Sequence, residues 1–411
     1  MEMSPPFCSF CLQFGAITSK LRLMELVERF LKLPEQSFFL FGPRGTGKTK
    51  WTKHAYPNGL NIDLLNPDLY YLLQAHPKRL IEFVEGSVDH PVSSQVVIID
   101  EVQKIPELLD VVHLLIEKYP GKIFALTGSS ARKLRSKGVN LLGGRALNLS
   151  MHPYMASELG KQFNLERALN YGMLPLVLAS KVPEKVLQSY ISVYLQEEVQ
   201  QEGLVRNVGG FARFLEIMSF SQGSPLNANN IARESHVGRK TIENYISILE
   251  DLLLGFRLNI FSHRAKRALA VHPKFYYFDC GVFRSLRPTG PMDKVSEIDG
   301  LSLESLIAQH LRSWCDYSEG NHKLYYWQTR SQVEVDFVIY GSSGMYAFEV
   351  KNSARCNSSD LKALKTFAED YPEAKRCLIY RGNDHLKIDD ILCIPCEEFL
   401  LNLFPGKTPI G

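Results

Sequence analysis

The chain has 411 residues, 45% of them hydrophobic and 22% charged, with a formal net charge of +3. This composition is that of a globular protein with room for roughly two to four domains. The near-neutral charge excludes nucleic-acid binding driven by an overall field, so any such contact must come from a local basic patch. Without a long apolar run or a basic targeting start, we expect a cytoplasmic protein with no membrane partner.

A glycine-rich segment lies near the start of the chain. Apolar residues at helical spacing predict a helix over Lys20–Leu33, and the apolar run Phe38–Phe41 predicts a buried strand. The next eight residues match the phosphate-loop pattern G-x-x-x-x-G-K-[ST] and are expected to bind ATP: Gly42, Pro43, Arg44, Gly45, Thr46, Gly47, Lys48 and Thr49. Lys48 would neutralise the β- and γ-phosphates, and the Thr49 hydroxyl would bind Mg²⁺. The alternative is a glycine-rich turn that binds no nucleotide.

A pair of carboxylates follows the next strongly apolar run. Gln95–Asp100 predicts a strand buried on both faces, and it ends directly before Glu101. Downstream of a phosphate loop, Asp100 would hold Mg²⁺ and Glu101 would polarise the attacking water as a catalytic base. An acidic start to the helix predicted over Pro106–Tyr119 is the alternative interpretation.

Small polar residues end the following predicted strand, Lys122–Ser130. In a doubly wound sheet, Thr127 and Ser129 would line the ligand crevice, where Thr127 could act on the γ-phosphate or the attacking water. A plain turn is the alternative. Arg145 follows two glycines and could stabilise transition-state charge, in cis or across a subunit interface, or be a surface charge.

Four segments together carry a family resemblance: Gly42–Thr49, Ile99–Lys104, Leu126–Ser130 and Gly144-Arg145. They resemble the AAA-type ATPases of bacteria and archaea that carry a restriction-nuclease-like C-terminal domain. The resemblance covers the chain from about Leu21. It implies that Gln103 lies near the sensing machinery and that Arg145 is a finger candidate.

The middle of the chain is mostly helical by pattern. Leu159–Phe220 resembles the helical lid of such ATPases and includes a long helix predicted over Gln188–Glu202. Ser224–Leu249 predicts a helix-turn-helix with Gly238 in the turn. The residues expected to reach bases or phosphates at the start of its second helix are Arg239, Lys240 and Thr241.

Two further segments, Leu252–Phe261 and Phe275–Phe278, predict the strands of a wing. The loop between them carries three basic residues suited to phosphate contacts, Arg264, Lys266 and Arg267. Because winged helices also serve as protein-packing modules in ATPases, DNA contact and protein contact both stay open.

The last part of the chain predicts an α/β domain in the order α-β-β-β-α-β. Leu303–Leu311 predicts a helix. Glu334–Ile339 alternates, which predicts Glu334 and Asp336 on one face and an apolar face of Val335, Phe337 and Ile339.

Asp336 followed after a hairpin by Glu349-x-Lys351 resembles the signature of the PD-(D/E)xK nucleases. Asp336, Glu349 and Glu304 would hold one or two Mg²⁺ ions, while Lys351 would orient or help deprotonate the attacking water. Such folds are also retained as inert binding platforms, so cleavage stays open. His310 is expected to be a surface or partly buried residue, not a metal ligand.

The sequence as a whole predicts an α/β protein with a P-loop AAA-type nucleotide domain, a helical lid, a winged helix and a restriction-endonuclease-like domain. The expected ranges are a flexible tail over 1–20, followed by 21–158, 159–222, 223–295 and 296–411. The predicted function is Mg²⁺-dependent ATP binding and hydrolysis, with action on DNA. The alternative is a nucleotide-gated scaffold with an inert nuclease-like domain, a protein partner and possible homo-oligomers.

Overall fold

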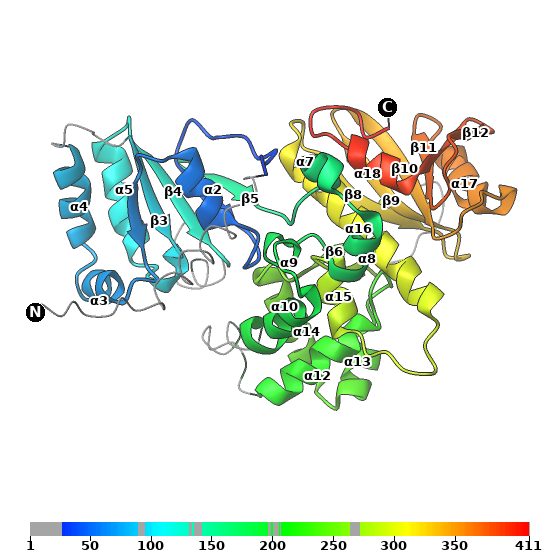
Figure 1. Ribbon diagram of the computed structural model, residues 1–411, viewed down its shortest axis with the longest axis horizontal. Helices are drawn as coiled ribbons and strands as arrows, with labels where there is room; N and C mark the ends of the chain where they lie inside the picture. Colours follow the sequence, from blue (N-terminus) through cyan, green and yellow to red (C-terminus); the bar gives the residue numbers. More distant parts are fainter. Residues whose placement is uncertain are drawn as a thin grey trace, which may run out of the picture.

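A computed structural model describes residues 27–88, 95–130, 142–195, 207–263 and 272–410, together with the single positions 134, 199 and 205. The chain forms an N-terminal α/β region at the left of Figure 1, a helical region at its lower centre and a C-terminal α/β region at its upper right. The predicted tail over 1–20 and the basic residues Arg264, Lys266 and Arg267 lie outside the described residues.

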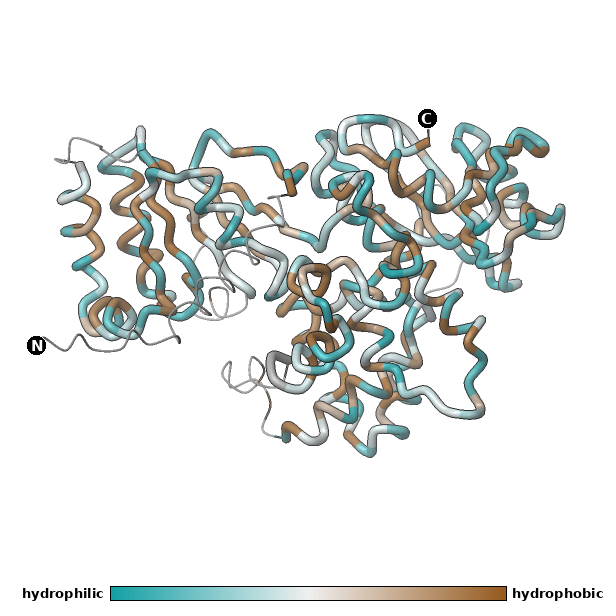
Figure 2. The backbone as a smooth tube through the Cα atoms, in the orientation of Figure 1, coloured by the Kyte–Doolittle hydropathy of each residue, from teal (hydrophilic) through white to brown (hydrophobic). Residues whose placement is uncertain are grey.

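The N-terminal region is built on a five-stranded parallel sheet in the order β2-β3-β4-β1-β5. Its strands are β1 (Phe38–Phe41), β2 (Leu60–Asp63), β3 (Val96–Asp100), β4 (Ile123–Gly128) and β5 (Leu147–Ser150). Successive residues of β1 enter different hydrophobic clusters, because side chains alternate along a strand. Strands β1, β3 and β4 are therefore buried along almost their whole length, whereas β2 and β5 also carry polar or exposed residues. The tube coloured by hydropathy marks the hydrophobic stretches in brown (Figure 2).

Helices cover this sheet on both faces. They are α2 (Lys48–Ala55), α3 (Pro67–Ala75), α4 (Arg79–Val88) and α5 (Leu108–Lys118). Helices α3 and α4 are separated at His76, whose φ of −138° and ψ of 74° end α3. The cause is Pro77, because a proline disfavours the helical conformation of the residue before it.

The prediction of a helix over Lys20–Leu33 is wrong for residues 27–33, the part of this range that the structure describes. Residues 27–33 form no helix. Instead, the backbone N–H of Phe30 donates to Glu158 Oε1 at 2.8 Å, and the Arg29 side chain binds the same carboxylate. A tertiary ion pair thus outweighs the local helical preference.

The helical region begins after β5 with six short elements. They are α7 (Ala156–Leu159), η2 (Gly160–Gln162), α8 (Leu165–Tyr171), α9 (Pro175–Leu178), α10 (Pro183–Ser189) and the π-helix η3 (Tyr190–Leu195). The long helix predicted from Gln188 is thus divided between α10 and η3, and most of its second half lies outside the described residues.

A second group of helices follows at the positions that the sequence predicts. It comprises α12 (Val208–Ser219), α13 (Ala228–Ser235) and α14 (Arg239–Asp251), then the antiparallel pair β6 (Gly255–Leu258) and β7 (Lys274–Tyr277), and α15 (Cys280–Leu286). The Asn227 side chain accepts hydrogen bonds from two backbone N–H groups at the start of α13. Phe211 and Phe214 of α12 contact the Tyr245 ring of α14, with centroids 5.0 and 5.3 Å away. Helices on either side of the predicted boundary at 222 are therefore in contact with each other.

The C-terminal region has the predicted α-β-β-β-α-β order. It contains α16 (Val295–Tyr317), β8 (Lys323–Gln328), β9 (Glu334–Gly341), β10 (Gly344–Lys351), η4 (Ser358–Leu361), α17 (Lys362–Asp370), β11 (Lys375–Tyr380), β12 (Leu386–Ile388), β13 (Ile391–Pro395) and α18 (Cys396–Asn402). The six strands lie in the order β12-β13-β11-β10-β9-β8. Among the described helices, even α16 with its 23 residues is not apolar enough to cross a membrane.

Helices α16 and α18 pack on one face of this sheet and α17 on the other. The prediction that Val335 shares a face with Phe337 and Ile339 is wrong. Val335 packs in the cluster of α17, whereas Phe337 and Ile339 pack in the cluster of α16. The β8–β9 register shifts between Tyr325 and Trp327, and such an irregularity breaks the alternation of side chains.

Candidate active site

The glycine-rich loop joins the carboxyl end of β1 to the start of α2. Gly45 and Gly47 have φ angles of 84° and 94°, which favour glycine over other residues. At Gly42 a Cβ atom would lie 2.4 Å from the backbone oxygen of Met151, so no larger residue fits. The loop conformation therefore depends on the glycines that the phosphate-loop pattern requires.

Lys48 is turned into the loop and is only 6% exposed. Its ammonium donates to the backbone oxygens of Gly42, at 2.7 Å, and Pro43, at 3.2 Å. From the opposite side, the Tyr190 hydroxyl of η3 donates to the Arg44 oxygen at 3.0 Å. The loop thus holds a positive charge at its centre, as phosphate binding requires.

Two predicted residues, Thr49 and Thr127, meet at the Asp100 carboxylate, at the carboxyl end of β3. The Thr49 hydroxyl donates to Asp100 Oδ2 at 2.7 Å, and the Thr127 hydroxyl donates to Oδ1. A hydroxyl and a carboxylate side by side are the oxygen ligands that Mg²⁺ takes from proteins beside nucleotide phosphates. The described residues contain no group of three or more His, Cys, Asp or Glu side chains that could hold a metal. A magnesium ion here would therefore also need phosphate and water oxygens.

Glu101 follows Asp100 in a left-handed conformation, with φ 59° and ψ 44°. Such conformations are costly for residues other than glycine and cluster at functional sites. The Gln103 amide holds the carboxylate by donating to Glu101 Oε2, and it also donates to Ser129 Oγ at 3.0 Å. The amide oxygen of Gln103 is buried without a hydrogen-bond partner. Only the family resemblance had indicated Gln103, and the structure places it between the predicted base and the end of β4.

Arg145 lies at the amino ends of the parallel strands, away from the carboxyl ends that carry the phosphate loop and Asp100. It precedes β5, whose first residue, Leu147, donates its N–H to the Ser37 oxygen just before β1. Its guanidinium pairs with Glu117 at 2.8 Å, near the end of α5. The phosphate loop leaves the sheet at the opposite edge, so the structure does not bring Arg145 to the loop of its own chain. Of the predicted finger roles, only the one across a subunit interface fits this placement.

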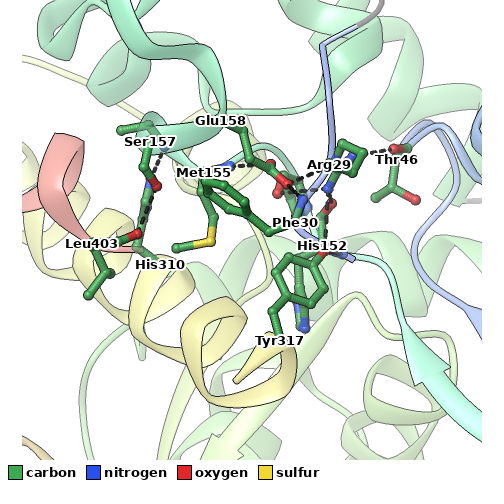
Figure 3. A network of polar contacts seen from close by, with 12 residues as sticks. Arg29, Phe30, Thr46, His152, Met155, Ser157, Glu158, His310, Tyr317 and Leu403 are labelled. Carbon is green, nitrogen blue, oxygen red and sulfur yellow. Dashed lines mark hydrogen bonds and ion pairs between the residues drawn. The ribbon is translucent and has the colours of Figure 1, made fainter. Parts of the chain in front are cut away.

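Arg29 links the phosphate loop to distant parts of the chain (Figure 3). Its guanidinium donates to Glu158 Oε1 at 3.1 Å, to the backbone oxygen of Thr46 at 3.1 Å and to that of His152 at 2.6 Å. It also donates to the Tyr317 hydroxyl of α16 at 3.3 Å. Burial opposes the charge of Arg29, but Glu158 and the neighbouring tyrosines outweigh it and raise its pKa. This contact was not predicted, because nothing local to 27–33 indicates it.

His152 makes a second link from the nucleotide domain to α16. Its ring Nε2 lies 2.6 Å from Asp316 Oδ2, and its backbone N–H donates to the Tyr317 hydroxyl at 3.0 Å. Burial lowers the His152 pKa, which the hydrogen bond to Asp316 only partly offsets. The end of α16 is therefore fixed directly behind the phosphate loop.

His310 is fully buried between α7 and α16, so the expectation of a surface or partly buried residue is wrong. Its Nε2 accepts a hydrogen bond from the Ala156 N–H at 2.9 Å. Nδ1 lies 2.7 Å from the Leu306 oxygen and donates to it. These two contacts fix a neutral imidazole, because a protonated ring could not accept from Ala156.

This histidine gives the chain a pH-dependent stability. Burial lowers the pKa of His310 to about 4, whereas an unfolded histidine titrates near pH 6.5. Between these values the unfolded chain binds more protons, so stability falls as the pH falls through this window, by about 3 kcal/mol in all. We expect denaturant unfolding from pH 7 to pH 4.5 to show a shallower decline for His310→Gln. Equal slopes in the two proteins would contradict this assignment.

The predicted nuclease residues lie together between α16, β9 and β10. Asp336 Oδ2 accepts from the Val350 N–H at 2.7 Å, and Lys351 pairs with Glu349 Oε1 at 2.6 Å. Burial, together with the neighbouring Asp336, raises the pKa of Glu349 well above its usual range.

The other predicted ligand, Glu304, faces a lysine that the sequence did not indicate. Lys274 of β7 lies 3.6 Å from Glu304 and also pairs with Glu334. An ammonium thus lies beside one of the predicted ligands, and the binding of magnesium by Asp336, Glu349 and Glu304 stays a prediction.

The predicted nucleic-acid residues lie at the first turn of α14. Arg239 and Lys240 are exposed and Thr241 is half-buried. Arg239 pairs with Glu243 one turn later, at 2.8 Å. These side chains are accessible, and their contact with DNA stays a prediction.

Comparisons with known proteins agree with the nucleotide site. An AAA domain family model matches residues 34–160, and two models of domains of unknown function, DUF8612 and DUF4143, match 162–293 and 299–399. The AAA and DUF4143 matches point to a P-loop ATPase-like family.

Similar proteins extend over most of the chain. Uncharacterized protein Rv2008c of Mycobacterium tuberculosis is 23% identical over 88% of this chain and 80% of its own. Uncharacterized protein MJ1544 of Methanocaldococcus jannaschii is 24% identical over 68% of this chain and 67% of its own. A solved STAND protein, PH0952 of Pyrococcus horikoshii, is 14% identical and covers 76% of this chain and 48% of its own, with a TM-score of 0.21. A TM-score this low carries no argument about the fold.

Proposed function

We propose that the chain is a Mg²⁺-dependent ATPase that rearranges its C-terminal modules on DNA. The observation that carries the proposal is the meeting of Thr49, Asp100 and Thr127 beside the buried ammonium of Lys48. Loop, hydroxyl and carboxylate lie at the carboxyl edge of a parallel sheet, where α/β proteins bind ligands.

Each residue has a chemical task in this proposal. Lys48 exchanges the Gly42 and Pro43 oxygens for phosphate oxygens when ATP binds. Thr49 and Asp100 hold the magnesium ion, which supplies charge neutralisation for the phosphates. Glu101 takes the proton of the attacking water, and Gln103 positions its carboxylate.

The contacts of Arg29 give a route from the nucleotide to the rest of the chain. The guanidinium touches both the Thr46 oxygen of the phosphate loop and the Tyr317 hydroxyl of α16. A change in the loop on ATP binding or hydrolysis would therefore act on the helix that packs against the C-terminal sheet.

DNA is the partner that the exposed basic start of α14 favours, with β6 and β7 as a winged-helix hairpin and the C-terminal region as a nuclease-like fold. A second candidate is a nucleotide-gated scaffold with an inert C-terminal domain and a protein partner. It is favoured by the lysine among the predicted metal ligands. ATPase rates with and without double-stranded DNA, together with plasmid nicking in Mg²⁺ or Mn²⁺, separate the two candidates.

The nucleotide site itself is tested by Lys48→Ala. The ammonium is expected to make charge-assisted bonds to two phosphates, so its loss should weaken ATP and ADP binding by about a hundredfold or more. Fluorescent nucleotide titration measures this change. Lys50→Ala, at an exposed position of the same helix, is the control and should bind as the unmodified chain does. Equal affinities in all three proteins would refute the assigned site.

A further inference from the structure

The backbone of Lys274 pairs with a neighbouring segment on each side. In the β6–β7 pair it lies opposite Leu258, and on its other side it forms a bridge with Pro225. The backbone oxygen of the preceding residue, Pro273, accepts from the Leu226 N–H at 2.9 Å. Strand β7 therefore lies between β6 and the segment around Pro225, and the backbone position of Lys274 is fixed on both sides.

The side chain of Lys274 runs from this hairpin into the C-terminal region and is only 2% exposed. Its ammonium lies 5.3 Å from the centre of the Tyr326 ring of β8. It ends between two carboxylates, pairing with Glu334 of β9 and lying 3.6 Å from Glu304 of α16. Burying a lysine ammonium and two carboxylates removes all three charges from water. The attraction between them must offset this free-energy cost.

Both carboxylates have a further protein donor: at Glu304 it binds Oε1, the oxygen that also faces the ammonium, and at Glu334 it binds Oε2, the oxygen that Lys274 leaves open. The Tyr276 hydroxyl, from the same strand as Lys274, donates to Glu304 Oε1 at 2.6 Å. The Gln328 amide of β8 donates to Glu334 Oε2 at 2.7 Å. The hairpin thus supplies one cation and one hydroxyl to the acids, and β8 supplies an amide.

Glu304 is one of the acids that the sequence predicts as ligands of a nuclease metal. Asp336, another predicted ligand, lies on β9 two residues after Glu334 and already accepts a backbone N–H. A metal ion at this position would have to share Glu304 with an ammonium group, and two cations at one carboxylate repel each other.

We propose that Lys274 is the resident cation of this carboxylate cluster, in place of a divalent metal ion. The cluster of Glu304, Glu334 and Asp336 then serves as a charged joint that fastens the β6–β7 hairpin to the C-terminal sheet. A C-terminal region built in this way binds and positions but does not perform metal-dependent cleavage. The inference about Lys274 does not depend on nucleotide chemistry. It can therefore fail while the ATPase assignment holds, and it can hold if the ATPase assignment fails.

The test is to remove the ammonium and ask whether a metal takes its place. Lys274→Met keeps an unbranched side chain that is one heavy atom shorter and deletes the charge. The full-length, nucleotide-free protein is titrated with Mn²⁺, and free Mn²⁺ is followed by electron paramagnetic resonance. We expect Lys274→Met to gain one Mn²⁺ site and to bind Mn²⁺ at least tenfold more tightly than the unmodified chain does. Lys375→Met, at an exposed lysine of β11 in the C-terminal sheet, is the control and should gain no site.

A stability measurement covers the case in which Lys274→Met folds poorly. Its melting temperature should be lowered without metal and partly restored by Mn²⁺, and Asp336→Asn in the same chain should remove the restoration. The proposal is overturned if the unmodified chain binds Mn²⁺ at a site that Asp336→Asn abolishes. It is also overturned if Lys274→Met neither binds Mn²⁺ nor is stabilised by it.

Discussion

Glu101→Gln is expected to bind ATP as tightly as the unmodified chain and to hydrolyse it about a hundred to ten thousand times more slowly. The amide has the size of the carboxylate but cannot take a proton from water, and general-base catalysis contributes about this range. Glu101 lies directly after Asp100 at the carboxyl end of β3, and its left-handed backbone holds it in place. Single-turnover hydrolysis measures the chemical step, while nucleotide titration measures binding.

Two further variants sharpen this experiment. Glu107→Gln, at an exposed position just before α5, removes a nearby charge and should leave turnover unchanged. Gln103→Ala should keep the Glu101 carboxylate but allow it to move, because the amide that donates to Glu101 and Ser129 is lost. Its effect should be smaller than that of Glu101→Gln. Turnover in Glu101→Gln equal to that of the unmodified chain would exclude it as the base.

Arg29→Met is expected to lower the free energy of unfolding by about 3–5 kcal/mol. The Arg29–Glu158 pair is buried, with side chains 5% and 0% exposed, so removing the guanidinium leaves an uncompensated carboxylate. Urea unfolding followed by circular dichroism gives the difference. The backbone oxygen of Thr46 also loses a donor, so ADP affinity should fall together with stability.

A double variant separates charge burial from simple loss of contacts. Arg29→Met with Glu158→Leu removes both charges, and replacing a whole buried pair is far less costly than breaking it. We therefore expect the double variant to be more stable than Arg29→Met alone. An exposed pair such as Lys32–Glu319, with side chains 74% and 85% exposed, should contribute little, so Lys32→Met is the control. A loss as small in Arg29→Met as in Lys32→Met would contradict the role given to the buried pair.

The parts of the site that could be predicted are those whose residues are neighbours in sequence. The phosphate loop, Asp100 and Glu101 follow from short patterns at the ends of apolar strands, and the structure brings Lys48, Thr49 and Asp100 together. The central strands β1, β3 and β4 likewise follow from apolar runs, whereas β5, with its exposed and half-buried residues, offers no such run.

What could not be predicted depends on pairs far apart in the chain. Arg29 and Glu158 are separated by 129 residues, and Lys274 and Glu334 by 60. Nothing around Arg29 or Lys274 distinguishes them from surface cations, because burial is decided by the packing of other segments. His310 was misjudged for the same reason, since its burial comes from α7 packing on α16.

One hydrophobic cluster runs without a break from Phe38 and Ile98 of the first sheet, through Met155 and Leu306, to Phe348 of the last sheet. The 23-residue helix α16 thus lies at the centre of a shared interior, although the sequence places it in a separate domain. Heating should therefore melt the two α/β regions in a single cooperative transition. A fragment ending at residue 295 would leave apolar surface of α7 and α8 in water, and it should aggregate where the whole chain stays dissolved.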